Sequence, residues 1–129
     1  MEGGRGGLVL RVDGELRFLP AALAARVAPA PRVTAVPGAP PDLLGIAMHE
    51  GTIVPVVAIG SARAEMIVCQ HAGELVGLLG GEVVRAGRFE PVEGRADLVR
   101  VDGERARQLD VGAIYARVQT GGRPGRGVR

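Results

Sequence analysis

An internal repeat constrains this chain more than any other feature of its sequence. Leu8 and Val9 recur 59 positions later as Ile67 and Val68. The same offset carries Gly14, Glu15, Leu16, Leu19 and Arg26 onto Gly73, Glu74, Leu75, Leu78 and Arg85. Such self-similarity predicts two copies of one small structural unit. Neither copy is long enough to bury a stable core alone, so we expect the two copies to pack together.

Both repeats place apolar runs around turn-forming dipeptides, a pattern that predicts β-hairpins. The first repeat begins with two runs around Asp13–Gly14, and the second begins with two around Ala72–Gly73. A weaker echo relates the dipeptide Glu50–Gly51 to Asp102–Gly103. The 21 glycines and nine prolines among 129 residues also favour short strands over long helices.

The stretch Val36–Ile59 contains the clearest hairpin. Its expected strands, Leu43–Met48 and Ile53–Ile59, flank the polar turn His49–Thr52. Pro55 lies inside the second strand, and proline offers no N–H to a sheet ladder. We therefore expect the second strand to lie at the edge of its sheet.

Three further elements follow from local sequence. Pro20 predicts the start of a short Ala-rich helix that ends before Pro29, because proline is tolerated at the first helical position. Arg32–Val36 has the pattern of a strand. Asp110 is an accepted N-cap residue and predicts a final helical segment through Arg117.

The Val36–Ile59 hairpin resembles the most recognisable segment of CheW-like domains, the adaptors of bacterial chemosensory arrays. The family's V-P-x-x-P lead-in, its two turn glycines and its Pro-Val strand correspond here to Val36–Pro37, Pro40, Gly45, Gly51 and Pro55–Val57. In the second half, Val76–Leu79 followed by Glu82–Val84 matches the family's usual V-G-L-x-V-D-x-V run.

The resemblance implies a mainly β fold of two SH3-like five-stranded β-barrels packed together. Short helices would follow the second strand and lie near the C-terminus. The CheW-like domain would cover residues 8–118, divided into subdomains at roughly 8–64 and 65–118. A flexible arm at 1–7 and a disordered Gly/Arg tail at 119–129 would flank it.

The resemblance also implies a non-enzymatic adaptor. Such an adaptor would couple the cytoplasmic tip of a chemoreceptor to the regulatory domain of a CheA-type histidine kinase. The expected partner-binding residues are Arg26, Val27, Val33, Met48, His49, Glu50, Gly51 and Val84. The three valines are groove candidates, since apolar side chains exposed on edge strands often mark contact sites.

The tip of the hairpin departs from the family pattern. Met48, His49 and Glu50 stand where Asn, Leu and Arg are usual, and Arg26 occupies the position of a usual Glu. The Glu and Arg of the family are typically paired. We therefore expect Arg26 and Glu50 to form an ion pair of reversed polarity. The altered tip also leaves open a relative that binds the kinase and has lost the receptor contact.

No arrangement of residues predicts catalysis, a cofactor or a bound metal. Cys69 and His71 are two residues apart, so a strand would place them on one face as a thiol–imidazole pair. Cys69, however, lies in an apolar run that predicts a core position. A single cysteine gives neither an internal disulfide nor zinc-ligand spacing. Gly77–Gly81 lacks the Lys-Ser/Thr of a phosphate-binding loop and instead suggests a tight barrel corner.

Charge and hydropathy narrow the remaining function classes. The sequence pI is near 9.5, yet residues 1–118 hold thirteen arginines against fourteen acidic residues. The excess positive charge therefore belongs to the tail, and a small nucleic-acid-binding β-barrel is the alternative reading. The sparse aromatic residues disfavour base stacking.

Neither a signal peptide nor an apolar run long enough to span a membrane is evident, which predicts a cytoplasmic protein without membrane insertion.

Overall fold

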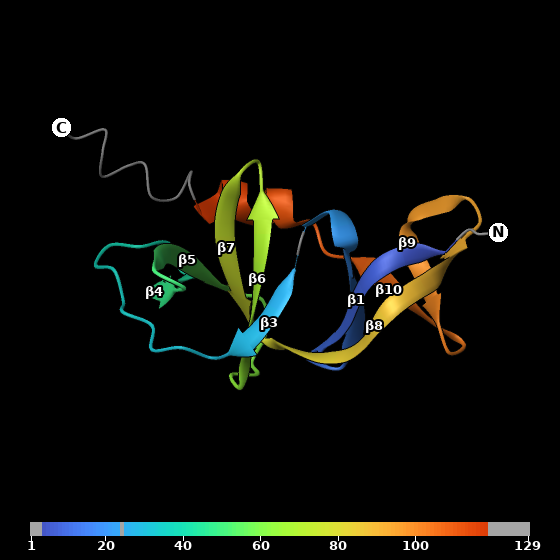
Figure 1. Ribbon diagram of the computed structural model, residues 1–129, viewed down its shortest axis with the longest axis horizontal. Coiled ribbons are helices and arrows are strands. Elements are labelled where there is room, and N and C mark those ends of the chain that lie inside the picture. Colours follow the sequence, from blue (N-terminus) through green and yellow to red (C-terminus); the bar gives the residue numbers. More distant parts are fainter. Residues whose placement is uncertain (1–3, 24, 119–129) are drawn as a thin grey trace.

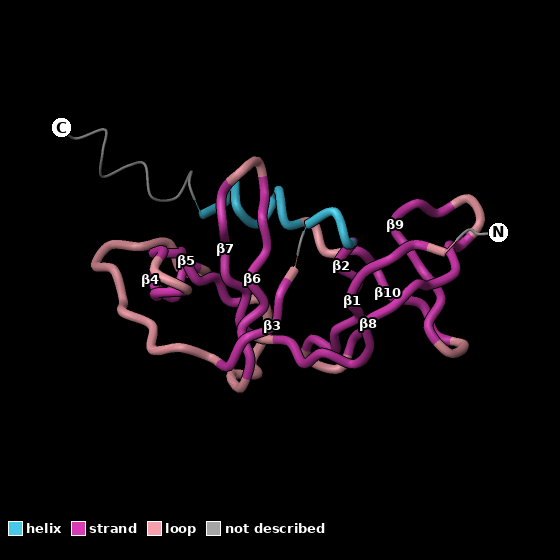
Figure 2. Tube along the Cα trace, viewed as in Figure 1, coloured by secondary structure: helices cyan, strands magenta, loops and turns pink. Residues whose placement is uncertain are grey.

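The computed structural model describes residues 4–23 and 25–118, and strands make up most of this part of the chain (Figures 1 and 2). The strands are β1 (Arg5–Val12), β2 (Glu15–Pro20), β3 (Arg26–Pro29), β4 (Leu43–His49), β5 (Thr52–Ala58), β6 (Glu65–His71), β7 (Glu74–Leu79), β8 (Gly81–Val92), β9 (Arg95–Val101) and β10 (Glu104–Gln108). A 3-10 turn, η1 (Ala21–Leu23), follows β2, and residues 111–118 form an α-helix.

The strands form two modules, which lie side by side along the long axis of the molecule (Figure 1). One module is a closed barrel in the order β1-β2-β10-β9-β8, and the other is a five-stranded sheet in the order β3-β6-β7-β5-β4. The expected division into subdomains 8–64 and 65–118 is therefore wrong. Each module takes strands from both halves of the chain, because β8 runs on from β7 and pairs with β1.

The internal repeat explains this exchange of strands. An offset of 59 residues superimposes β2 on β7, and an offset of 52 superimposes the β4–β5 turn on the β9–β10 turn. The hairpin β1–β2 joins β8, β9 and β10 of the second repeat, whereas β6–β7 joins β3, β4 and β5 of the first. The parallel pairs β2–β10 and β5–β7 occupy equivalent places. The sequence repeat is thus real, but each repeat contributes to both modules.

The second module is an open sheet rather than the expected barrel. In the first module, the twelve-residue strand β8 reaches β9 and closes the barrel. Its counterpart β3 has only four residues, and Pro31 and Pro37 withhold N–H donors from the chain beyond it. The expected strand Arg32–Val36 is accordingly reduced to one bridge, between Thr34 and Ile46.

Two further local expectations are wrong for tertiary reasons. The Ala-rich helix predicted after Pro20 is only the turn η1, because Arg26–Pro29 pairs with β6 as a strand. The strand that contains Pro55 is not an edge strand, since β5 lies between β4 and β7. Pairing with β7 begins at Val56, so Pro55 precedes that second ladder and its missing N–H is tolerated.

The buried residues form one cluster inside each module and a third between the modules. Phe18, Phe89 and Val99 belong to the barrel interior, and Val54 and Met66 belong to the sheet interior. The third cluster joins the outer faces of β1 and β2 to those of β6 and β7, and it comprises Leu10, Val12, Leu19, Val57, Ile67, Cys69, Val76, Leu78, Val111, Ile114 and Val118. Both faces of these strands are therefore buried, which explains their near-continuous apolar sequences.

Specific contacts fix the junction between the modules. The side chain of Asp110 accepts a hydrogen bond from the Ala113 N–H at 2.9 Å and so caps the helix, whose apolar face covers the shared core. Gly80 forms the corner between β7 and β8 with φ +135°, and a Cβ there would lie 2.1 Å from the Gly60 nitrogen. The corner therefore requires glycine.

The structure describes the two ends of the chain only in part. β1 begins at Arg5, so residues 5–7 of the expected flexible arm belong to a strand. Residues 1–3 and the tail 119–129 lie outside the described residues.

Candidate partner-binding site

The hairpin β4–β5 carries most of the predicted partner-binding residues. His49 and Thr52 pair across a two-residue turn, in which Glu50 has φ +50° and Gly51 has φ +82°. Positive φ at both turn positions gives the twist that two-residue hairpins prefer, and Gly51 adopts it without steric cost. The turn therefore projects Glu50 at the end of the sheet.

The predicted ion pair between Arg26 and Glu50 is present at this turn. The Arg26 Nη2 donates to the Glu50 Oε1 at 2.6 Å. The pair thus links β3 to the turn between β4 and β5. The side chains are 60% and 65% exposed, so water screens their attraction. Because exposed pairs contribute little to folding, this pair is better placed to affect recognition than stability.

His49 completes a polar cluster with this pair. Its side chain is only 12% exposed, and its Nε2 lies 3.4 Å from the Arg26 Nη2 and 3.9 Å from the Glu50 Oε1. A cavity of about 290 Å³ opens beside the cluster and is lined by Arg26, His49, Glu50, Thr52, Val68, Gln70 and Leu75. The hairpin tip is thus ordered by side-chain contacts as well as by its turn.

An equivalent ion pair lies at the β9–β10 turn of the barrel. We call this turn the barrel end of the molecule and the β4–β5 turn the sheet end. Arg85 corresponds to Arg26 through the offset of 59, and Asp102 corresponds to Glu50 in the β9–β10 turn. The Arg85 guanidinium makes two contacts with the Asp102 carboxylate, at 2.5 and 3.2 Å. An arginine paired with a hairpin-turn carboxylate is therefore a feature of both repeats of this chain. Among residues 4–23 and 25–118, a histidine contact is found at the Arg26–Glu50 pair and none at the Arg85–Asp102 pair.

The predicted apolar residues differ widely in their surroundings. Met48 is 60% exposed, Val84 is 47% exposed and Val27 is 42% exposed, so all three can contact a partner. Val33 is partly buried and packs against the core of the sheet, which makes it a packing residue. Ile53, which was not among the predicted residues, lies directly opposite Met48 and is also 60% exposed. Ile53 and its neighbour Val54 are both apolar, so the sequence did not show which of the two faces solvent.

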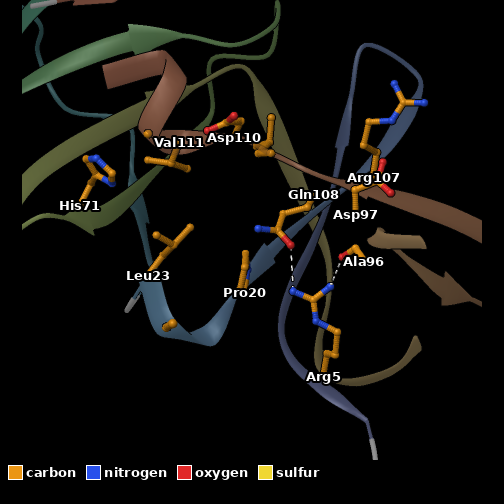
Figure 3. Close-up of a pocket in the computed structure, with 13 residues that line it drawn as sticks. Arg5, Pro20, Leu23, His71, Ala96, Asp97, Arg107, Gln108, Asp110 and Val111 are labelled. Atoms are coloured by element: carbon orange, nitrogen blue, oxygen red, sulfur yellow. Dashed lines mark hydrogen bonds between the residues drawn. The ribbon is translucent and has the colours of Figure 1, made fainter. Parts of the chain in front are cut away.

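A larger cavity lies elsewhere, between the barrel, η1 and the start of the helix. It has a volume of about 780 Å³, and its apolar wall includes Pro20, Leu23 and Val111 (Figure 3). Arg5 stands at one end, where its guanidinium donates to the Ala96 carbonyl and to the Gln108 side chain, both at 2.8 Å. None of the predicted groove valines lines this cavity.

The chemistry of the buried thiol agrees with a core role for Cys69. The residue is fully buried in the cluster between the modules, and burial raises the pKa of its thiol to about 12. The thiolate, which is the nucleophilic form, is therefore scarce at neutral pH. Within residues 4–23 and 25–118, no group of three or more His, Cys, Asp and Glu side chains is arranged to hold a metal ion.

The fold and this surface define a small, mainly β protein whose exposed hairpin suits contact with other proteins. The sequence model of the CheW-like domain family matches residues 6–119, and the chain belongs to this family. The scaffolding protein TtCheW from Thermoanaerobacter tengcongensis has a similar fold, with a TM-score of 0.70 and 18% sequence identity over 86% of this chain and 87% of TtCheW. A comparison with curated protein sequences found no match. In the described part of the chain, no helix is both long and apolar enough to cross a bilayer.

Proposed function

We propose that this protein is a non-enzymatic, cytoplasmic scaffold of a bacterial chemosensory system. It would couple the cytoplasmic tip of a chemoreceptor to the regulatory domain of a CheA-type histidine kinase. Membership of the CheW-like family supports the class of function. The observation that carries the proposal for this chain is its exposed hairpin, which presents an apolar pair and contributes Glu50 to an exposed ion pair.

The apolar pair consists of Met48 and Ile53, which face each other across β4 and β5. Two large apolar side chains at 60% exposure are unfavourable in water and favour burial against a partner. The positions themselves do not require apolar residues, because their counterparts in the other repeat are Arg100 and Arg105, which also pair across two strands. The apolar character of the sheet-end hairpin therefore serves contact better than folding.

The ion pair Arg26–Glu50 would give this contact its selectivity. A partner surface that complements the usual polarity of the family would present like charge to both members of this pair. Like charges brought together at an interface disfavour association, so the reversed pair would exclude partners of related systems. The cognate kinase would carry the matching arrangement of charges.

A second candidate function follows from the tip residues Met48, His49 and Glu50, which replace the usual Asn, Leu and Arg. The protein would then bind the kinase without the receptor. The two candidate functions differ in whether the protein binds to receptor-containing membranes when the kinase is absent. Sedimentation with such membranes, with and without the kinase regulatory domain, separates them.

Calorimetric titration with the cognate kinase regulatory domain tests the proposal. Replacing Ile53 with Asp places a charge in the apolar contact and should reduce the affinity at least about tenfold, equivalent to about 1.4 kcal/mol. Val36 is also an exposed apolar residue but lies in the loop before β4, so Val36→Asp is the matched control. Equal effects of the two variants, or no binding by the unmodified protein, would refute the proposal.

A further inference from the structure

The arginines of the described residues are unevenly partnered. Nine of the thirteen donate a hydrogen bond or form an ion pair: Arg5, Arg11, Arg17, Arg26, Arg63, Arg85, Arg88, Arg95 and Arg117. The four without either contact in residues 4–23 and 25–118 are Arg32, Arg100, Arg105 and Arg107. Three of these four lie on one hairpin, β9–β10.

Strand geometry places these three arginines on one face of the hairpin. Arg105 pairs directly with Arg100 across the two strands, and Arg107 follows two positions later on β10. Side chains two residues apart on a strand point to the same face, and the intervening Ala106 is buried in the barrel. All three arginines are exposed. We call Arg100, Arg105 and Arg107 the basic face.

The nearby carboxylates do not neutralise the basic face. Glu90 lies opposite Arg100 on β8, but the two form no ion pair among the described residues. Asp97 interacts electrostatically with Arg107. Its carboxylate, however, accepts two hydrogen bonds from Arg95, which lower its pKa. Asp102 is bound by Arg85. Asp97 and Asp102 are thus bound by other arginines and Glu90 makes no ion pair with Arg100 among the described residues, so the three arginines keep donors available.

The basic face is unfavourable for the isolated fold. Like charges directly opposite each other on adjacent strands destabilise a sheet. The equivalent positions at the sheet end are Met48 and Ile53, which shows that the architecture accepts uncharged residues there. The two ends of the molecule therefore share one geometry and differ in chemistry, apolar at one end and basic at the other.

We infer that the basic face docks a carboxylate-rich surface of a protein partner, distinct from the partner contact at the β4–β5 hairpin. Guanidinium groups bind carboxylates through parallel, charge-assisted hydrogen bonds. A protein surface suits the basic face better than a nucleic acid, because both described phenylalanines, Phe18 and Phe89, are buried and cannot stack on bases. The protein would then have two docking ends that recognise different chemistry.

Fluorescence anisotropy with a labelled oligoglutamate peptide at low salt tests this inference without any kinase or receptor. Arg105→Glu should weaken peptide binding at least about fivefold. The same substitution places a carboxylate opposite Arg100 and should raise the Tm, whereas a residue with a purely structural role would lower it. Arg32→Glu makes the same change of charge at the fourth unpartnered arginine and should leave peptide binding nearly unchanged.

A second variant, Arg100→Gln, removes one charge without adding another and should weaken binding in the same direction. The inference is overturned if the unmodified protein does not bind oligoglutamate, or if Arg32→Glu weakens binding as much as Arg105→Glu. Tighter binding of duplex DNA than of oligoglutamate, lost in Arg105→Glu, would also overturn it and assign the basic face to nucleic acid.

Discussion

Exchanging the charges of Arg26 and Glu50 separates the role of this pair in folding from its role in recognition. The double variant Arg26→Glu with Glu50→Arg keeps one positive and one negative side chain at the hairpin tip. Neither the turn nor the core changes, because both side chains are more than half exposed. We expect the double variant to fold normally and to bind the cognate kinase regulatory domain more weakly.

The geometry sets an upper limit on the effect on folding. Two unit charges separated by the observed 2.6 Å attract by about 1.6 kcal/mol in bulk water. Ordering two long side chains and screening by salt reduce the net contribution of such an exposed pair to about 0–1 kcal/mol. Arg26→Glu alone should therefore lower the unfolding free energy by about 1 kcal/mol or less, and the double variant should recover most of that loss.

The expected effect on recognition is larger than the effect on folding. At an interface, water is excluded from the pair, and a reversed pair presents like charge to the partner at both positions. We expect at least about a tenfold loss of affinity, or about 1.4 kcal/mol, in the double variant. Thermal unfolding and calorimetric titration with the kinase regulatory domain measure the two effects on the same samples.

The barrel end provides the matched control. Arg85 and Asp102 form the repeat-equivalent pair, with the same polarity at the same place in the fold. The exchange Arg85→Asp with Asp102→Arg should leave affinity for the kinase regulatory domain within about twofold. Unchanged affinity after the Arg26/Glu50 exchange would refute the reasoning, as would an equal loss in both double variants.

Three other outcomes follow from the structure and the sequence. The Cys69 thiol, whose pKa burial raises to about 12, should react with a thiol reagent only after the protein is unfolded, and rapid reaction of the native protein would contradict its core position. Ser61 donates two hydrogen bonds to Asp13 and lowers the pKa of that carboxyl, so these bonds stabilise the fold above the ordinary carboxyl pKa and cease to do so as the pH falls through the pKa of Asp13 in the folded protein. The difference in unfolding free energy between the unmodified protein and Ser61→Ala should therefore shrink as the pH is lowered. A difference that stays constant with pH would contradict this role of Asp13. Removing residues 119–129, which hold four glycines that are costly to order, should leave kinase affinity unchanged, and a tenfold loss would assign the tail to the interface.

Local features of the fold were predictable because short-range chemistry determines them. The turns at Asp13–Gly14, Glu50–Gly51, Ala72–Gly73 and Asp102–Gly103 all connect adjacent antiparallel strands, and their first residues all have positive φ. The offset of 59 residues likewise corresponds to two equivalent hairpins. Turn dipeptides and repeats are written in contiguous sequence, so no tertiary information is needed to find them.

The exchange of strands between the repeats was not predictable in the same way. Which hairpin joins which three strands depends on pairing between residues far apart in the chain, such as β1 with β8. The same local sequence patterns are compatible with two subdomains divided at residue 64 and with two modules that each combine strands from both repeats. Tertiary pairing also overrode helix propensity at Arg26 and Val27, which form a strand against β6.

Part of the candidate site was predictable, because the resemblance to CheW-like domains led us to expect Arg26 and Glu50 to pair. The structure brings their side chains within 2.6 Å. Ile53 was missed because a single apolar residue in a strand gives no sign of which face it occupies until the pairing register is known. Arg5 was missed because a glycine-rich N-terminal sequence suggested a flexible arm, whereas its guanidinium lies 5.0 Å from the centre of the buried Phe18 ring.

The most direct test of the proposed scaffold function maps the kinase contact on this protein by NMR. Amide signals of the isotopically labelled chain would be followed during titration with the cognate kinase regulatory domain. The proposal predicts that the largest shifts or losses of signal occur at Met48, Glu50, Ile53 and Arg26, with little change at Val36. Binding of the kinase domain that leaves the signals of the β4–β5 hairpin unchanged would contradict it.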